Sequence, residues 1–197
     1  MKILAIEREF GSGGREIGMK VAEAAGIPYY DTNLLIEAAE RFDISIGKLQ
    51  EYDEKNCGSM MYNLVLAANC LQGEDMSEIY KIQSGVKETI RRLGAEGPAG
   101  FIGRCATEIF KYHENVIRVF IYSSNTQKKI RRTMQVEQIS EEEARKLMDK
   151  KDRSRKNYFK FFTGSDWKDR KNYDLELNTG MLPTEECVRI LCDMIQR

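Results

Sequence analysis

The stretch that decides the fold reads Arg8-Glu9-Phe10-Gly11-Ser12-Gly13-Gly14-Arg15-Glu16-Ile17. It follows the apolar run Ile3–Ile6 and leads into a helical pattern over residues 16–25. A buried strand, a glycine-rich turn and a helix start are therefore adjacent in the chain. Glycines allow positive φ and close approach of backbone N–H groups, and a helix N-terminus attracts anions. The predicted phosphate-binding residues are Arg8, Gly11, Ser12, Gly13, Gly14, Arg15 and Glu16.

This turn departs from the phosphate loop of ATP-using enzymes, whose pattern is G-x-x-x-x-G-K-[ST]. Gly14 stands where the lysine is expected, and Arg15 stands where the hydroxyl residue is expected. The alternative for residues 11–14 is a tight strand-to-helix turn that binds no ligand, since α/β domains commonly contain such turns.

Length and composition limit the class of protein. The 197 residues suffice for one substantial core, and we expect a single domain over residues 1–197. The 31 basic and 31 acidic side chains cancel, which argues against a protein that mainly coats nucleic acid. Five cysteines without a C-x-x-C pair and a single histidine predict neither a zinc site nor a disulfide framework. No signal-like segment or bilayer-spanning apolar run is found, so we expect a cytoplasmic protein without a membrane partner.

Strand and helix patterns alternate along the chain. Strands are predicted at 3–6, 27–30, 101–102, 116–122 and 173–178, with the fourth as a buried, central strand. Helices are predicted at 16–25, 33–42, about 105–112, after Ser124 or Asn125, after Ser140 and after Pro183. The last helix is expected to turn Val188, Ile190, Leu191 and Met194 inward. Alternation of this kind predicts an α/β fold in three layers, with a mostly parallel five-stranded sheet between helices.

Two segments interrupt the alternation. Residues 33–94 read as a helical insertion, and residues 124–172 contain a basic helical hairpin. In the insertion, Met60, Met61, Leu64, Leu66 and Leu71 form either its core or a homodimer interface.

Polar residues follow three predicted strands. Gly11–Gly14 follow the first strand, Asp31 the second and Arg104 the third. Ligands of parallel α/β sheets bind at the carboxyl ends of the strands, so we expect these residues to share one site. Asp31 could instead be an ordinary helix N-cap, and Arg104 a surface residue or the partner of an acidic helix.

These residues resemble the cytidylate kinase-like proteins, relatives of the nucleoside monophosphate kinases within the P-loop group. The resemblance spans nearly the whole chain. It rests on residues 8–17, Tyr30-Asp31-Thr32, Gly103-Arg104, Asp152-x-x-Arg155-x-x-Tyr158-Phe159 and Thr163-Gly164. It implies a P-loop kinase-like fold in which residues 124–172 form a mobile lid and residues 33–94 bind substrate.

The resemblance also implies site residues. Substrate binding falls to Asp31, Arg104, Asp152 and Arg155. Catalytic charge falls to Arg15, Arg104 and Arg155, because arginines can supply the cations that phosphoryl transfer requires. ATP and Mg²⁺ are implied as cofactors. No metal ligand set is assigned, and the nearest candidates are Glu9, Ser12, Glu16 and Asp31.

The chain also differs from cytidylate kinases. They have Gly-Lys-Gly-Thr where this chain has Gly-Gly-Arg-Glu at 13–16, and an aspartate where it has Cys105. The sequence therefore leaves three hypotheses open. The first is a kinase-like phosphotransferase that uses a nucleoside triphosphate and a small phosphorylated acceptor such as a pyrimidine nucleoside monophosphate. The second is a nucleotide- or phosphate-binding regulatory module without transfer activity. The third is a nucleic-acid-binding protein that uses the basic hairpin, which the zero net charge disfavours.

Overall fold

The computed structural model describes residues 1–31 and 74–197. The predicted helix 33–42, the hydrophobic residues Met60–Leu71 and two of the five cysteines, Cys57 and Cys70, lie outside these residues.

A five-stranded sheet forms the middle of the protein. In spatial order its strands are β2 (Tyr29–Tyr30), β3 (Gly100–Ile102), β1 (Ile3–Arg8), β4 (Val116–Tyr122) and β5 (Leu175–Asn178). Every neighbouring pair is parallel, and Leu4 of β1 aligns with Gly100 of β3 and with Ile117 of β4. The predicted α/β fold is confirmed, with a sheet that is parallel throughout. β4 is an interior strand, as predicted, but β1 occupies the centre.

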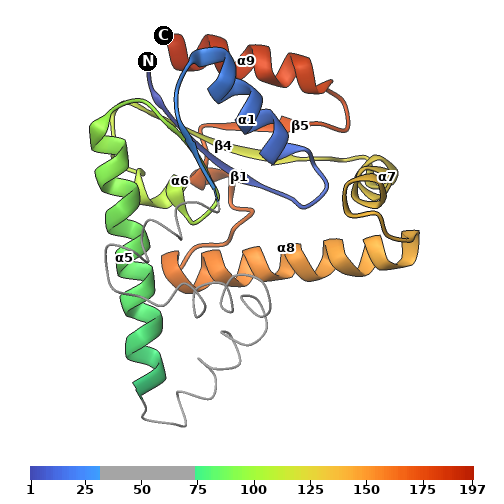
Figure 1. Cartoon of the computed structure of the whole chain (residues 1–197), viewed down its shortest axis with the longest axis horizontal. Coiled ribbons are helices and arrows are strands. Elements are labelled where there is room, and N and C mark those ends of the chain that lie inside the picture. Colours follow the sequence, from blue (N-terminus) through green and yellow to red (C-terminus); the bar gives the residue numbers. More distant parts are fainter. Residues whose placement is uncertain (32–73) are drawn as a thin grey trace.

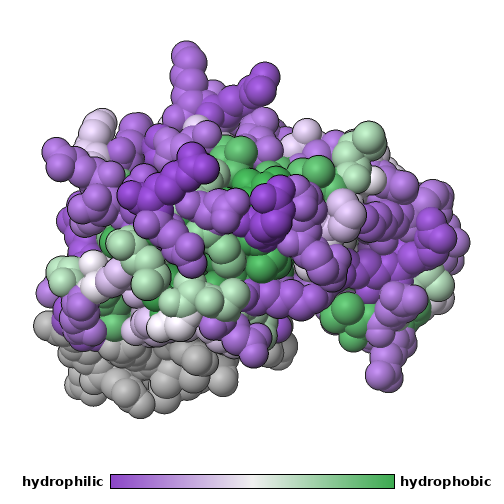
Figure 2. All heavy atoms as spheres, turned by 90° about the horizontal axis from the view of Figure 1, so that it is seen from above, coloured by the Kyte–Doolittle hydropathy of each residue, from purple (hydrophilic) through white to green (hydrophobic). Residues whose placement is uncertain are grey.

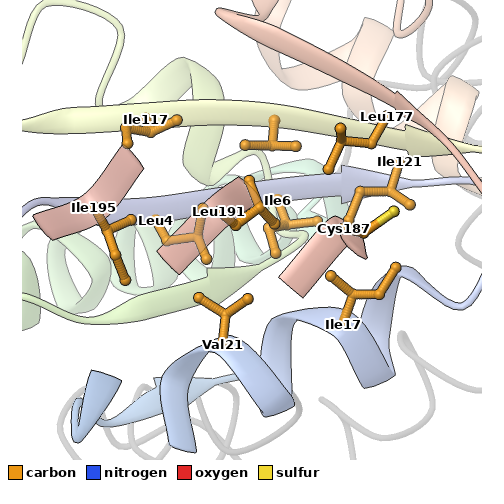
Figure 3. Close-up of a cluster of buried hydrophobic side chains, with 11 residues drawn as sticks. Leu4, Ile6, Ile17, Val21, Ile117, Ile121, Leu177, Cys187, Leu191 and Ile195 are labelled. Atoms are coloured by element: carbon orange, nitrogen blue, oxygen red, sulfur yellow. The ribbon is translucent and has the colours of Figure 1, made fainter. Parts of the chain in front are cut away.

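Helices α1 (Gly14–Ala25) and α9 (Thr184–Gln196) cover one face of the sheet (Figure 1). Ile17 and Val21 of α1 point toward Leu4 and Ile6 of β1, and Leu191 packs in the same cluster (Figure 3). The buried residues of α9 are Cys187, Leu191 and Ile195, whereas Val188, Ile190 and Met194 are only partly buried. Leu191 therefore faces the sheet as predicted, and Val188, Ile190 and Met194 pack against the same cluster from its edge. Cys187 and Ile195, one turn before and after Leu191, complete the buried face and were not predicted.

The opposite face carries α5 (Glu74–Glu96), α6 (Ala106–Ile109) and α8 (Glu141–Thr163). Val86 and Ile90 of α5 pack on Ile3, Ala5 and Phe101 of the sheet. A second cluster on this face joins Phe120 of β4, Phe159 of α8, Trp167 and Tyr173. Helices on both faces complete the predicted three layers.

The basic segment folds into α7 (Thr126–Glu137) and α8, followed by a short 3-10 helix, η1 (Arg170–Asn172). Asn125 is the N-cap of α7, since its side chain accepts a hydrogen bond from the Lys128 N–H at 3.0 Å. α8 begins after Ser140, as predicted, and Ser140 and Glu143 form a capping box at its start.

α6 is shorter than the predicted helix 105–112. Arg104 and Cys105 both have φ of 58°, in the left-handed region, so the helix cannot begin before Ala106.

The surface is mixed in character. On the face seen in Figure 2, hydrophilic side chains predominate and hydrophobic ones gather mainly in its middle. Over residues 1–31 and 74–197, no helix has the length and apolarity needed to cross a bilayer.

Candidate functional site

The turn between β1 and α1 offers a set of backbone donors. Gly11 and Gly13 have φ of 74° and 83°, which turns the chain sharply before α1. In the part of the chain that the structure describes, no acceptor is hydrogen-bonded to the N–H groups of Gly11, Gly13, Arg15 and Glu16. Such a group of free N–H donors at a helix N-terminus is a cradle for an anion. We call residues 9–16 the phosphate loop from here on.

Other residues fix the shape of the phosphate loop. The Ser12 hydroxyl is buried, donates to the Glu9 carbonyl at 2.8 Å and accepts from the Gly14 N–H at 3.3 Å. The Thr179 hydroxyl, just after β5, donates to the Ser12 carbonyl at 2.8 Å. The hydroxyl of Ser12 therefore supports the loop from within.

Gly14 stands at the lysine position because a side chain has no room there. A β-carbon on Gly14 would lie 2.6 Å from the Arg8 β-carbon and 3.2 Å from that of Ile121. The Arg8 side chain runs past Gly14 and brings its guanidinium against Gly103, where a β-carbon would overlap it. Arg8 thus extends from the phosphate loop to the turn after β3.

The turn after β3 is left-handed over three residues. Gly103, Arg104 and Cys105 have φ of 84°, 58° and 58°. Non-glycine residues rarely adopt this conformation, and it persists where the surroundings hold it. Here the buried Glu7 carboxylate accepts the Cys105 N–H at 3.2 Å and the Trp167 indole N–H at 3.2 Å. Burial raises the pKa of Glu7, and the charge of Arg8 opposes that shift.

Arg104 lies at the carboxyl end of β3, as predicted, and its guanidinium is 5.8 Å from the centre of the Tyr158 ring on α8. Burial raises the pKa of the adjacent Cys105 thiol well above its ordinary value, so this cysteine is an unreactive packing residue. Arg104 is thus the residue that this turn presents toward α8.

The D-x-x-R pair of α8 grips the start of the phosphate loop. Asp152 accepts the Phe10 N–H at 2.6 Å, and Arg155 donates to the Arg8 carbonyl at 2.9 Å. The Arg155 guanidinium also lies 5.4 Å from the centre of the Phe10 ring. Burial, followed by the charge of Arg8, lowers the pKa of Arg155 to about 9, so it remains charged at neutral pH. Both residues therefore contact the loop backbone in this structure.

Glu9 collects two lysines at the base of the loop. Lys129 of α7 lies 2.9 Å from one carboxylate oxygen of Glu9, and Lys168 lies 2.7 Å from the other. Lys129 is 8% exposed and is also 3.5 Å from Asp152. Burial alone would raise the pKa of Glu9, but the hydrogen bonds from Lys168 and Lys129 outweigh it and lower that pKa.

The remaining predicted residues, Arg15, Glu16 and Asp31, form ion pairs at the rim. Arg15 is 62% exposed and its Nε lies 2.5 Å from the Asp31 carboxylate. Glu16 binds Arg132 of α7 and lies 2.8 Å from Lys20. Hydrogen bonds from Lys20 and then Arg132 lower the pKa of Glu16. The structure therefore brings the predicted residues of the loop, Asp31, Arg104, Asp152 and Arg155 to one end of the sheet.

Sequence analysis missed three residues of this site, Lys129, Arg132 and Lys168. The first two lie in the basic run of α7, where four cations share similar sequence surroundings. Only the packing of α7 on the loop singles them out. A β-carbon on Gly11 would lie 2.8 Å from Thr133 Oγ1, and one on Gly13 would lie 3.4 Å from Arg132 Cζ.

The site fits the phosphates of a nucleotide better than it fits a metal ion. The free N–H groups and the flanking arginines suit an anion. The carboxylates that sequence analysis named as magnesium candidates are all paired with cations, Glu9 with Lys129 and Lys168, Glu16 with Lys20 and Arg132, and Asp31 with Arg15. Among the described residues, no three His, Cys, Asp or Glu side chains converge on one point. The side chains present therefore do not fit a magnesium ion.

Residues 3–181 match the sequence profile of the cytidylate kinase-like family. The chain belongs to this family. The match includes every residue of the site described above. No curated protein gives a significant match to the chain.

Solved structures share the fold of this cytidylate kinase-like protein. An uncharacterized protein from Eubacterium ventriosum has a TM-score of 0.74 and 28% identity, over 100% of this chain and 99% of that chain. A shikimate kinase from Bacteroides thetaiotaomicron has a TM-score of 0.55 and 14% identity, over 100% and 99% of the two chains. A shikimate kinase from Acinetobacter baumannii in complex with shikimate has a TM-score of 0.51 and 12% identity, over 100% of this chain and 93% of that chain.

The family and these structures together identify a kinase fold of the P-loop type. The cytidylate kinase-like chain keeps the parallel sheet and the strand-to-helix phosphate loop of that fold. It differs within the loop, where Gly14 and Arg15 stand at the positions of the usual lysine and hydroxyl residue.

Proposed function

We propose that this protein is a phosphotransferase that moves a phosphoryl group from a nucleoside triphosphate to a small anionic acceptor. The observation that carries the proposal is the course of Arg8, whose side chain passes Gly14 of the phosphate loop and ends against Gly103. The Arg8 side chain thus spans from the anion cradle to the turn that presents Arg104, and its guanidinium lies at that turn. A cationic side chain that spans two such sites suits a phosphoryl group in transit, because the charge of that group is spread over several oxygens.

The roles of the other residues follow from their contacts. The N–H groups of the loop would hold the phosphates of the nucleotide, with Arg15 at the rim. Arg104 would bind the acceptor, and Asp31 would orient it from the end of β2. Asp152 and Arg155 would fix the backbone of residues 8–10, so that Arg8 keeps its direction.

The organisation proposed for the chain is a single kinase-like domain over residues 1–197. Residues 33–94 would form the acceptor-binding insertion and residues 124–172 the lid. The family suggests a pyrimidine nucleoside monophosphate as the acceptor. The fold shared with shikimate kinases adds a second class, a small carboxylate. Both are anions that an arginine can bind through a planar fork.

A coupled assay of the purified protein with ATP and magnesium tests the proposal. The acceptors are CMP, dCMP, UMP, AMP, GMP and shikimate, each assayed separately. We expect turnover with one class of acceptor. Arg104→Ala should lower kcat/KM by roughly tenfold or more, since a charged hydrogen bond contributes about 1.5–3 kcal/mol.

Arg189→Ala is the control for Arg104→Ala. Arg189 is an exposed arginine of α9 that pairs with Glu186 one turn away, so its loss should leave kcat/KM unchanged. Equal activity of the wild type and Arg104→Ala would show that the acceptor binds elsewhere.

The second candidate is a phosphate-binding module without transfer activity. It is favoured by Gly14 at the lysine position and by the pairing of Glu16 with two cations. ATP binding in calorimetry, combined with no turnover for any acceptor, would support this candidate and exclude the phosphotransferase. The nucleic-acid hypothesis is disfavoured, because Lys129, Arg132 and Arg155 of the basic hairpin face the phosphate loop.

A further inference from the structure

Several cations lie in or beside the phosphate loop, and the partners of Arg15, Lys129, Arg132, Arg155 and Lys168 differ. Lys129 bonds the mostly buried Glu9, and Arg155 bonds the carbonyl of Arg8. Lys168 also bonds Glu9, and Arg15 turns to Asp31 at the end of β2. These four contacts hold the loop or its surroundings in shape. Arg132 is the exception, because its partner Glu16 lies where the loop enters α1, among the residues with free N–H groups.

Arg132 lies directly against the anion cradle. Its Cζ, Nε and Nη1 atoms would all lie 3.4–3.6 Å from a β-carbon on Gly13. Gly13 and Glu16, the two residues that Arg132 contacts, each contribute one of the free N–H groups. A phosphate held by these N–H groups would therefore be within reach of the Arg132 guanidinium. No lysine can play this part from position 14, where a β-carbon would meet Arg8.

The fit between α7 and the loop keeps Arg132 in this place. Thr133, the next residue, is 2% exposed, and its Oγ1 has no hydrogen-bond partner among the described residues. This hydroxyl lies 2.8 Å from the position of a β-carbon on Gly11. Lys129, one turn earlier, anchors the same face of α7 to Glu9. The backbone of α7 is thus fixed on the loop. The partly exposed outer half of the Arg132 side chain can still change its rotamer and its ion-pair partner.

We propose that Arg132 binds the terminal phosphates of the nucleotide in place of the missing lysine, and that Glu16 is an internal competitor for the same guanidinium. The proposal rests on the nucleotide site proposed above and deepens it. Without phosphate, the Glu16 carboxylate occupies Arg132. With phosphate in the loop, Arg132 turns to the phosphate oxygens and Glu16 keeps Lys20.

Because the Arg132–Glu16 ion pair is partly exposed, breaking it costs little free energy. The side chains of Arg132 and Glu16 are 33% and 38% exposed, and exposed ion pairs contribute little to stability. A phosphate carries more charge than a carboxylate and offers more acceptor oxygens, so it competes well for a guanidinium. Glu16 would thus raise the phosphate concentration needed to occupy the loop, without blocking it.

The test is calorimetric titration of the chain of residues 1–197 with inorganic pyrophosphate, and separately with ATP, both without divalent metal. Arg132→Gln should weaken binding roughly tenfold or more, because a charged hydrogen bond is lost. Glu16→Gln should tighten binding roughly two- to fivefold, the range that an exposed ion pair supports. In the background of Arg132→Gln, adding Glu16→Gln should not tighten pyrophosphate binding, because the guanidinium for which Glu16 and phosphate compete is absent.

Two variants control for net charge. Arg131→Gln removes an exposed arginine of α7 that donates to the Gln127 carbonyl of its own helix, and Glu23→Gln removes an exposed carboxylate of α1. Their effects should stay within about twofold, because exposed charges at a distance are screened. Melting curves followed by circular dichroism establish that each variant is folded.

The outcomes separate this proposal from the proposed function. It is overturned if Arg132→Gln binds pyrophosphate as Arg131→Gln does, if Glu16→Gln tightens binding equally without Arg132, or if no variant binds pyrophosphate. The predicted binding pattern without turnover of any acceptor would support it while excluding the phosphotransferase. Turnover by the wild type, combined with unaltered pyrophosphate binding in Arg132→Gln, would support the phosphotransferase and overturn the role of Arg132.

Discussion

At the scale of single residues, the site is a set of carboxylates that organise cations. Glu7 holds the left-handed turn through the Cys105 N–H, and Glu9 holds Lys129 and Lys168. Asp152 fixes the Phe10 N–H. The cations of a phosphate site repel one another when no phosphate is present. Interleaved carboxylates offset that repulsion and give the arginines fixed directions.

Glu9→Gln is a prediction at this scale. The change leaves the buried Lys129 with only Asp152, so it should cost roughly 1–3 kcal/mol of unfolding free energy at pH 7. The pKa of Glu9 is lowered in the folded state, so its contribution is present above the ordinary value of 4.5 and is lost as pH falls through the lowered pKa. The difference between the wild type and Glu9→Gln should therefore narrow as pH falls below 4.5.

Urea unfolding at a series of pH values measures this difference. Glu137→Gln, which removes an exposed carboxylate of α7, serves as the control and should show no such pH dependence. A Glu9→Gln deficit that stayed constant with pH would mean that the carboxylate charge is not what stabilises this cluster.

At the scale of elements, α7 and the phosphate loop are fitted to each other. Gly11 has positive φ and also faces Thr133 and the carbonyl of Lys129, so it meets two separate requirements for glycine. Gly26 ends α1 with φ of 64° but faces open space, so it meets only the first. Comparing substitutions at Gly11 and Gly26 therefore separates the cost of backbone strain from the cost of a steric clash.

Gly26→Ala should lower the unfolding free energy by about 1–2 kcal/mol, because alanine is strained in the left-handed conformation. Gly11→Ala should cost at least about 1 kcal/mol more, because α7 must move away from the loop. Pyrophosphate binding should fall sharply in Gly11→Ala and persist in Gly26→Ala. Urea unfolding and calorimetry measure the two effects. Equal stability of the two variants would show that α7 is not closely packed on the loop.

Sequence reasoning succeeded where local patterns decide the structure. The β-branched run Val116–Tyr122 predicted the bounds of β4, and Ser140 predicted the start of α8. It failed where contacts between distant segments decide. The start of α6 depends on Glu7, which holds Cys105 in a left-handed conformation. Nothing near Arg132 in the sequence distinguishes it from Arg131, since only the packing of α7 directs one toward the loop and the other to solvent.

The site shows the same division. The strand ends placed residues 11–14, Asp31 and Arg104 at one edge of the sheet, which the structure bears out. The directions of their side chains could not be predicted, because they depend on partners. Arg15 turns to Asp31 across the rim, and Arg8 turns away from its own loop toward Gly103.

At the scale of the whole molecule, the two hydrophobic faces of the sheet form one structure. Leu191 of α9 is fully buried on one face, and Trp167, the protein's single tryptophan, is buried beside Phe120 on the other. β4 contributes to both faces, through Ile117 to the first and Phe120 to the second. We therefore expect the sheet and its helices to unfold together.

Leu191→Ala should lower the unfolding free energy by roughly 2–5 kcal/mol, the cost of a cavity in a well-packed core. Because the change lies across the sheet from Trp167, tryptophan fluorescence reports on it only if unfolding is cooperative. Fluorescence and far-ultraviolet circular dichroism should give the same urea midpoint, shifted by the same amount. Separate midpoints for the two signals would contradict a single domain.

The grip of α8 on residues 8–10 also restricts how the gene can vary. Asp152 and Arg155 reach the Phe10 N–H and the Arg8 carbonyl only because they share one side of a helix whose start is set at Ser140. Each inserted or deleted residue between Ser140 and Asp152 would rotate that side by about 100° and shift it by about 1.5 Å. This stretch can therefore accept many substitutions on its outer side. An insertion or deletion in it would be selected against, because its length places Asp152 and Arg155 on the loop.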